Sequence, residues 1–151
     1  MKRVLSILLL LGTATVILTG CSNKGTNESN NIDLDLSELS SMLVYSQVVN
    51  ILDDPMGYVE KTIKINGQYY ASYFESTKQY YHFVVVGDET LCCQSGIEFV
   101  WKGEHDYPDD YPENKTDIQL VGVFGSYEEL GRTYYSLTVD DIVIVNKQLS
   151  S

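Results

Sequence analysis

The stretch Ile63-Lys64-Ile65-Asn66-Gly67-Gln68-Tyr69 decides the fold that this sequence predicts. Apolar residues alternate with polar ones along it, and this alternation is typical of a β-strand that buries one face. The glycine in its middle indicates a bulge or a sharp bend, because glycine brings no side chain to pack. We therefore expect a bent strand over about 62–73.

A second stretch repeats this pattern later in the chain. Ile118-Gln119-Leu120-Val121-Gly122-Val123-Phe124 also reads apolar-x-apolar-x-Gly-x-aromatic. Two bent strands of one closed sheet would require the same residues, and closure of a sheet removes its exposed edges. Further strand patterns cover about 79–86, 97–101, 117–125 and 133–137, and 142–145 either extends the last strand or forms one of its own. The chain is therefore predicted to be mainly β, with a small five-stranded barrel. The alternative is an open β-sandwich or a curled sheet.

One α-helix is predicted to precede these strands, over about 38–52. Ser40 or Ser41 can cap its start, and Asp53-Asp54-Pro55 ends it. Apolar residues recur at helical spacing and form one stripe, which we expect to pack against the core. This stripe consists of Met42, Tyr45, Val48, Val49 and Leu52. The helix would then close one end of the barrel.

The N-terminus has the layout of a secretory leader. Two basic residues precede an almost uncharged apolar run, Val4–Leu18, which is short for a membrane span. The run ends in Leu18-Thr19-Gly20-Cys21, which resembles the lipobox of bacterial lipoproteins. The resemblance implies that residues 1–20 are a signal peptide and that Cys21 carries a diacylglycerol and an acyl chain. It implies an extracytoplasmic protein that Cys21 anchors in the lipid bilayer of the cell membrane. The alternative is an uncleaved signal anchor.

Cleavage before Cys21 would leave 131 residues, which is room for one domain. Residues 21–37 are rich in Asn and Ser and are expected to form a flexible tether, and 38–147 the barrel domain with its helix. The formal net charge is −11 and becomes −13 without the two basic residues of the leader. Because an acidic surface repels phosphate backbones, nucleic acid is not the expected partner. A protein, a peptide or a glycan fits this charge better.

The start of the first strand carries a second resemblance. The segment Asp54-Pro55-x-x-Tyr58-x-x-Lys61-x-Ile63-x-Ile65-x-Gly67 resembles the opening of OB-fold domains in bacterial lipoproteins and envelope proteins. The resemblance implies an OB-like barrel. The chain departs from that pattern at Glu60, where glycine is usual. It departs again over 102–115, where prolines interrupt a connection that often holds a helix in OB-folds.

The adjacent pair Cys92-Cys93 is a candidate thiol site, for which three interpretations stay open. The two thiols are packed or spare, or they close a vicinal disulfide, or they bind a soft metal. The metal would need help from His82, His105 or Glu98, because two ligands are too few for a structural zinc site. The pair and the following Gly96-Ile97-Glu98-Phe99 also resemble the OB-like domain of some permease-associated bacterial membrane proteins. No cofactor is expected beyond this metal.

The acidic loop 102–115 contains two Asp-Tyr-Pro repeats, whose Tyr107 and Tyr111 are candidates to present aromatic faces to a ligand. Its carboxylates lack the spacing and the glycine of a calcium loop. His82 and His105 have no catalytic triad around them, and the chain has no Gly-x-Ser-x-Gly elbow, so an enzyme is not expected. The sequence favours a non-enzymatic binding module. The alternative is a redox or metal-handling accessory protein that uses Cys92-Cys93.

Overall fold

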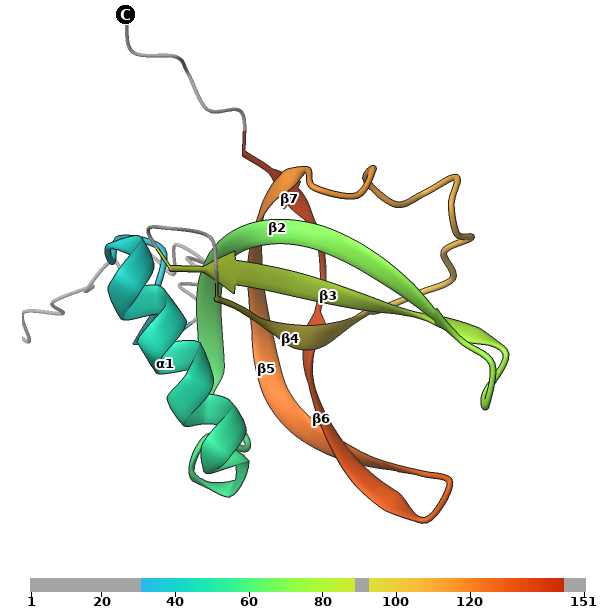
Figure 1. Cartoon of the computed structure of the whole chain (residues 1–151), viewed down its shortest axis with the longest axis horizontal. Coiled ribbons are helices and arrows are strands. Elements are labelled where there is room, and N and C mark those ends of the chain that lie inside the picture. Colours follow the sequence, from blue (N-terminus) through green and yellow to red (C-terminus); the bar gives the residue numbers. More distant parts are fainter. Residues whose placement is uncertain (1–30, 89–92, 146–151) are drawn as a thin grey trace, which may run out of the picture.

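A computed structural model describes residues 31–88 and 93–145 of the chain. The predicted leader, Cys21, most of the predicted tether, Cys92 and residues 146–147 lie outside the described residues. The structure is mainly β, with one α-helix in the described part, as predicted (Figure 1). Its elements are β1 (Leu34–Asp35), α1 (Ser41–Asp53), the 3-10 turn η1 (Pro55–Gly57), β2 (Thr62–Phe74), β3 (Gln79–Gly87), β4 (Gln94–Trp101), β5 (Asp117–Glu129), β6 (Arg132–Val139) and β7 (Val143–Ile144).

Five of the strands form a ring in which each strand pairs with two others. The order around the ring is β2-β3-β4-β6-β5, and β5 pairs back with β2. Only the β4–β6 pair is parallel, and the other four pairs of the ring are antiparallel. The short strands β1 and β7 add to β2 and β5. A ring leaves its five strands without a free edge along the paired segments, as the sequence pattern suggested.

The two glycines of the repeated pattern lie where a strand changes its partner. Strand β2 pairs with β5 over residues 62–68 and with β3 from residue 68 onward, so that Gly67 lies at the change. Strand β5 pairs with β2 over 117–123 and with β6 from residue 122, so that Gly122 has the same place. Figure 1 shows that β2 and β5 are both strongly curved. The expectation that both strands bend is confirmed.

The core fills the inside of the ring. The side chains at the apolar and aromatic positions of both repeated patterns are fully buried, with Tyr69 and Phe124 at the aromatic positions. The other fully buried side chains come from β3, β4 and β6, from α1 and from the segment before it. They are Leu36, Val48, Ile51, Val84, Ile97, Phe99, Leu137 and Val139.

The helix buries a different face from the one predicted. Helix α1 packs against β3 and β4, and its buried residues are Val44, Val48 and Ile51. Of the predicted stripe, Val48 is buried, whereas Met42 is 55% exposed and Leu52 44%. The helix is apolar over more than half of its circumference, so two neighbouring stripes compete and spacing alone does not decide between them. The prediction of the core-facing stripe was wrong for Met42, Val49 and Leu52, which are exposed, whereas Val48 is buried and Tyr45 is partly buried against the core.

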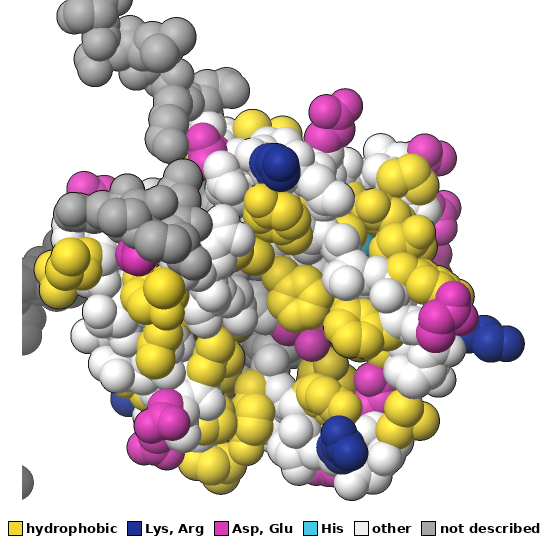
Figure 2. Space-filling model, in the orientation of Figure 1, with side chains coloured by type: hydrophobic (Ala, Val, Ile, Leu, Met, Phe, Trp, Pro, Cys, Tyr) yellow, Lys and Arg dark blue, Asp and Glu magenta, His cyan; other side chains and the backbone are white. Residues whose placement is uncertain are grey.

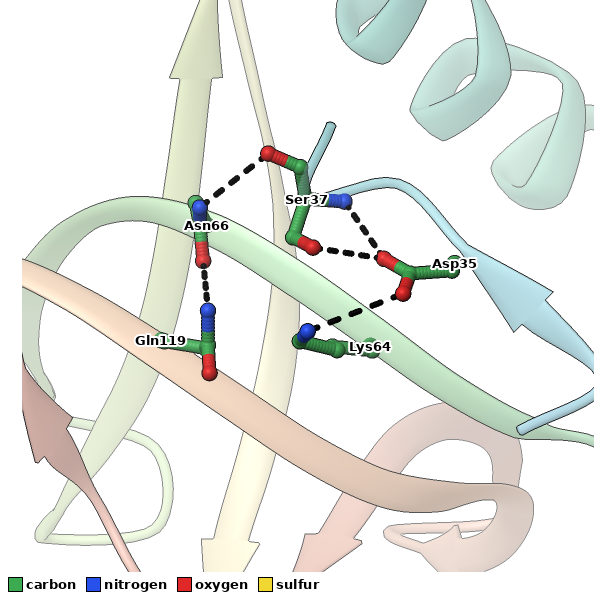
Figure 3. A network of polar contacts seen from close by, with 5 residues as sticks. All are labelled: Asp35, Ser37, Lys64, Asn66 and Gln119. Atoms are coloured by element: carbon green, nitrogen blue, oxygen red, sulfur yellow. Dashed lines mark hydrogen bonds and ion pairs between the residues drawn. The ribbon is translucent and has the colours of Figure 1, made fainter. Parts of the chain in front are cut away.

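The end of the predicted tether belongs to the fold. Strand β1 pairs with β2 in parallel, the Leu36 N–H donates to the carbonyl of Lys64 at 2.8 Å, and the Leu36 side chain is fully buried. Polar contacts continue this attachment, because Asn66 donates to the carbonyl of Ser37 and Lys64 lies 3.6 Å from Asp35 (Figure 3). The boundary at residue 37 is thus corrected, since the chain joins the domain by Asp33.

Candidate functional site

Two hairpins extend beyond the ring and enclose a groove. The hairpins are β2–β3, which turns at residues 75–78, and β5–β6, which turns at 130–131 (Figure 1). A cavity of about 230 Å³ lies between them. It is lined by Phe74, Ser76, Thr77, Tyr81, Phe83, Glu98, Tyr127, Glu129, Leu130 and Tyr134. We call these ten residues the hairpin groove. Figure 2 shows hydrophobic side chains gathered around a few acidic ones on this side of the molecule.

A row of four residues forms the floor of the hairpin groove. The Tyr81 hydroxyl donates to the Glu129 carboxylate, with both oxygens at 2.7 Å. The Tyr127 hydroxyl donates to the Glu98 carboxylate, at 2.8 and 2.9 Å. The same four residues also line a neighbouring hollow of about 310 Å³, on the side of Trp101 and the acidic loop. The row therefore separates two hollows and contributes its polar atoms to both.

The two carboxylates of this row, Glu98 and Glu129, are partly buried. Burial raises the pKa of Glu98, and the charge of Glu129 raises it further, whereas the hydrogen bond from Tyr127 lowers it. Within the described residues, the ion pairs are Lys64–Asp35 and Lys102–Asp140, so that no lysine or arginine there neutralises Glu98 or Glu129. Carboxylates that lack a cation and lie against aromatic rings can attract a positively charged group.

Sequence reasoning missed this row. Glu98 was named only as a helper for a metal, and Tyr81, Tyr127 and Glu129 were not named. The hydrogen-bonded partners are 48 and 29 residues apart, and only the closure of the ring brings them together. The available signal was the placement of Tyr81 and Glu98 at outward positions of predicted strands, but that signal does not say which strands face each other. Tyr127 and Glu129 lie beyond the predicted strand over 117–125, because β5 runs on to Glu129.

The predicted ligand residues of the acidic loop hold the loop against the sheet. The Tyr111 ring stacks on His82, with centroids 3.9 Å apart, and Tyr107 packs on Tyr80 at 4.4 Å. Both tyrosines are half-buried by these contacts. Tyr111 also borders the neighbouring hollow, so its free edge is placed where a ligand could reach it. Whether either ring contacts a ligand stays a prediction.

Under this loop lies a histidine whose charge is suppressed. His82 Nδ1 and the Tyr69 hydroxyl are hydrogen-bonded at 2.7 Å, and Tyr69 is fully buried. Burial lowers the pKa of His82 to about 4. The imidazole is therefore neutral near pH 7, and it serves as a packed polar partner for Tyr69.

We expect His82 to make the domain less stable as the pH falls from about 6.5 to about 4. The unfolded chain takes up the proton at the ordinary pKa, whereas the folded chain resists it, so the contribution is complete above pH 6.5. Between pH 7 and pH 5 the loss is about 1 kcal/mol, allowing for the partial exposure of the ring. Urea unfolding of the wild type and of His82→Gln measures it. The variant should be less stable at pH 7 but lose less than the wild type between pH 7 and pH 5. Equal losses would contradict this assignment.

The candidate thiol site is described only in part. Cys92 lies outside the described residues, and Cys93 is an exposed free thiol just before β4. In the β3–β4 register Gly87 pairs with Gln94 and His82 with Phe99. Glu98 and His82 therefore lie roughly 15 Å or more along the strands from Cys93. Over 31–88 and 93–145, no three His, Cys, Asp or Glu residues are grouped to hold a metal ion.

No protein-family model, curated protein or solved structure matches this chain. Within the described residues no helix has the length and apolar character needed to cross a membrane.

Proposed function

We propose that this protein is an extracytoplasmic lipoprotein, anchored to the cell membrane through Cys21, whose domain is a non-enzymatic binding module with an OB-like barrel. The strand order supports the fold assignment. If β2 is counted as strand one of the ring, β3, β4, β5 and β6 are strands two to five. The order around the ring is then 1-2-3-5-4 and back to 1, and strands three and five (β4 and β6) are parallel. This is the order of the five-stranded Greek-key barrel of OB-folds.

The hairpin groove is the observation that carries the binding function. OB-folds bind their ligands on the face of the second and third strands, between the loop of strands one and two and the loop of strands four and five. In this chain those loops are the turns of β2–β3 and β5–β6, and the face is that of β3 and β4. The groove lies at this place, and its walls are aromatic, as ligand-binding surfaces often are.

The N-terminal leader sequence supports the proposed membrane anchor at Cys21. Leu18-Thr19-Gly20-Cys21 resembles a lipobox, and two or three acyl chains hold a protein on a bilayer where one does not. With the domain starting by Asp33, about eleven residues separate it from Cys21. As a random coil this proposed tether would span roughly 20 Å. The domain would then stay near the membrane surface with room to turn its groove toward a partner.

We expect Cys21→Ser to move the protein from the membrane fraction to the soluble fraction of expressing cells. Both forms should bind the same members of a panel of envelope peptides and glycans. The double variant Phe74→Ser, Leu130→Ser should lose at least tenfold in affinity for these members, because it removes two exposed residues of the groove wall. Fractionation and surface plasmon resonance measure these effects.

The matched control for the groove is Leu43→Ser with Met56→Ser. These residues are also apolar and exposed, but they lie on α1 and η1, outside the groove. The control should keep wild-type affinity. Equal losses in both double variants would argue against the groove as the binding site, and a Cys21→Ser protein that stays in the membrane fraction would argue against the anchor.

A further inference from the structure

The floor of the hairpin groove has acceptor capacity that residues 31–88 and 93–145 leave unused. A carboxylate offers about four lone-pair sites, and Glu98 and Glu129 each receive one hydroxyl proton, from Tyr127 and Tyr81. Both carboxylates border both hollows. Among the residues that the structure describes, no lysine or arginine forms an ion pair with either of them. A ligand that brings donors and positive charge would complete this row.

The walls of the groove suit the same kind of group. A cation within about 6 Å of an aromatic face is attracted by the quadrupole of the ring, and more strongly where water is excluded. The groove has five aromatic residues around its two carboxylates. These are Phe74, Tyr81, Phe83, Tyr127 and Tyr134. Aromatic rings beside carboxylates favour an organic cation, with a charged end and an apolar stem, over a hydrated metal ion.

We propose that the hairpin groove binds an alkylammonium group, carried by the lysine side chain of a peptide or by a free polyamine. This inference rests on the proposed role of the groove as the ligand site. The cavity of about 230 Å³ is smaller than the pockets that hold drug-sized molecules, which are on the order of 300–1,000 Å³, and is suited to one side chain. The formal net charge of −11 would steer such a cation toward the protein.

The electrostatic cost of keeping Glu98 charged also supports a cationic ligand. Burial raises the pKa of Glu98, which means that folding disfavours its charged form. At neutral pH the charged Glu98 therefore reduces stability, and a glutamine would keep the acceptor for Tyr127 without that cost. Groups that a protein keeps charged against its own stability are typical of binding sites.

The test measures binding of three probes to the full-length protein in detergent by isothermal titration calorimetry. The probes are an N-acetylated tri-lysine amide, the same peptide with acetylated side chains, and spermidine. We expect the tri-lysine peptide or spermidine to bind and the acetylated peptide to bind at least tenfold more weakly. Binding of only one cationic probe identifies the source of the ammonium group. Glu98→Gln with Glu129→Gln should weaken cation binding at least tenfold, with a urea midpoint at pH 7 no lower than that of the wild type.

The matched control removes two exposed carboxylates elsewhere, with Glu128→Gln and Asp109→Asn. Glu128 is next to Glu129 on β5 but its side chain is held by Thr133. The control should stay within twofold of the wild type, and equal weakening in both variants would reduce the effect to diffuse attraction and overturn the proposal. If Glu98→Gln with Glu129→Gln does not fold, Glu129→Gln alone must still weaken binding more than the control. Equal binding of the acetylated peptide would contradict the proposal of a cationic ligand but would leave the groove as the binding site. Unchanged binding in Phe74→Ser with Leu130→Ser would contradict the groove as the binding site.

Discussion

Replacing Gly67 with alanine is expected to destabilise the folded domain by about 3 kcal/mol. A Cβ at this position would lie 2.7 Å from Val84 Cγ2 and 2.7 Å from the carbonyl oxygen of Val85. The Val84 side chain is fully buried and cannot turn away, and the carbonyl belongs to the backbone of β3. One of the two strands must therefore move. A loss of this size is a large part of the 5–15 kcal/mol that an ordinary domain has.

The sign of this effect separates crowding from conformational entropy. Replacing a strand glycine with alanine usually stabilises a protein slightly, because the unfolded chain loses freedom. Gly125→Ala is the matched control, since nothing lies within 4 Å of a Cβ there. Chemical denaturation should show Gly125→Ala within about 1 kcal/mol of the wild type, on the stable side. Gly122→Ala should behave like Gly67→Ala, because its Cβ would meet Val139 Cγ1 at 2.7 Å. Similar stabilities for Gly67→Ala and Gly125→Ala would contradict the close approach of the strands.

The ring could be predicted because its determinants are local. Alternation assigns the faces of β2 and β5, and a glycine at the same place in both strands marks the change of partner. Both signals lie within seven consecutive residues. A residue pattern of this kind reports the geometry of its own strand, and two such strands with matching patterns already restrict how a small sheet can close.

The helix face and the groove depend on information that is not local. Met42 and Val44 are both apolar, and the choice between their faces depends on where β3 and β4 lie, which the helix sequence does not contain. Tyr81 and Glu129 meet only because the ring closes. The burial of Leu36 was also hidden, since polar neighbours such as Asp35 and Ser37 gave the segment the composition of a tether.

The second large loss of stability is expected on truncation of Leu36, and this variant tests where the domain begins. Leu36→Ala is expected to cost about 3 kcal/mol, since it removes a fully buried side chain and leaves a cavity between β1 and the ring. Loss of the side chain would also loosen the segment that pairs with β2, where Asp33 and Leu36 donate backbone hydrogen bonds to Thr62 and Lys64. Urea unfolding of the full-length chain measures the loss.

Leu39→Ala is the matched control for this boundary. Leu39 is three residues further along the chain and 39% exposed, so the same truncation removes less buried surface. It should cost less than about 1 kcal/mol. If the two variants lose the same small amount, residues up to 37 behave as a tether and the domain begins at the helix. If Leu36→Ala alone is strongly destabilised, the segment from Asp33 to Leu36 is part of the folding unit. Eleven residues, 22–32, would then join the domain to the proposed anchor at Cys21.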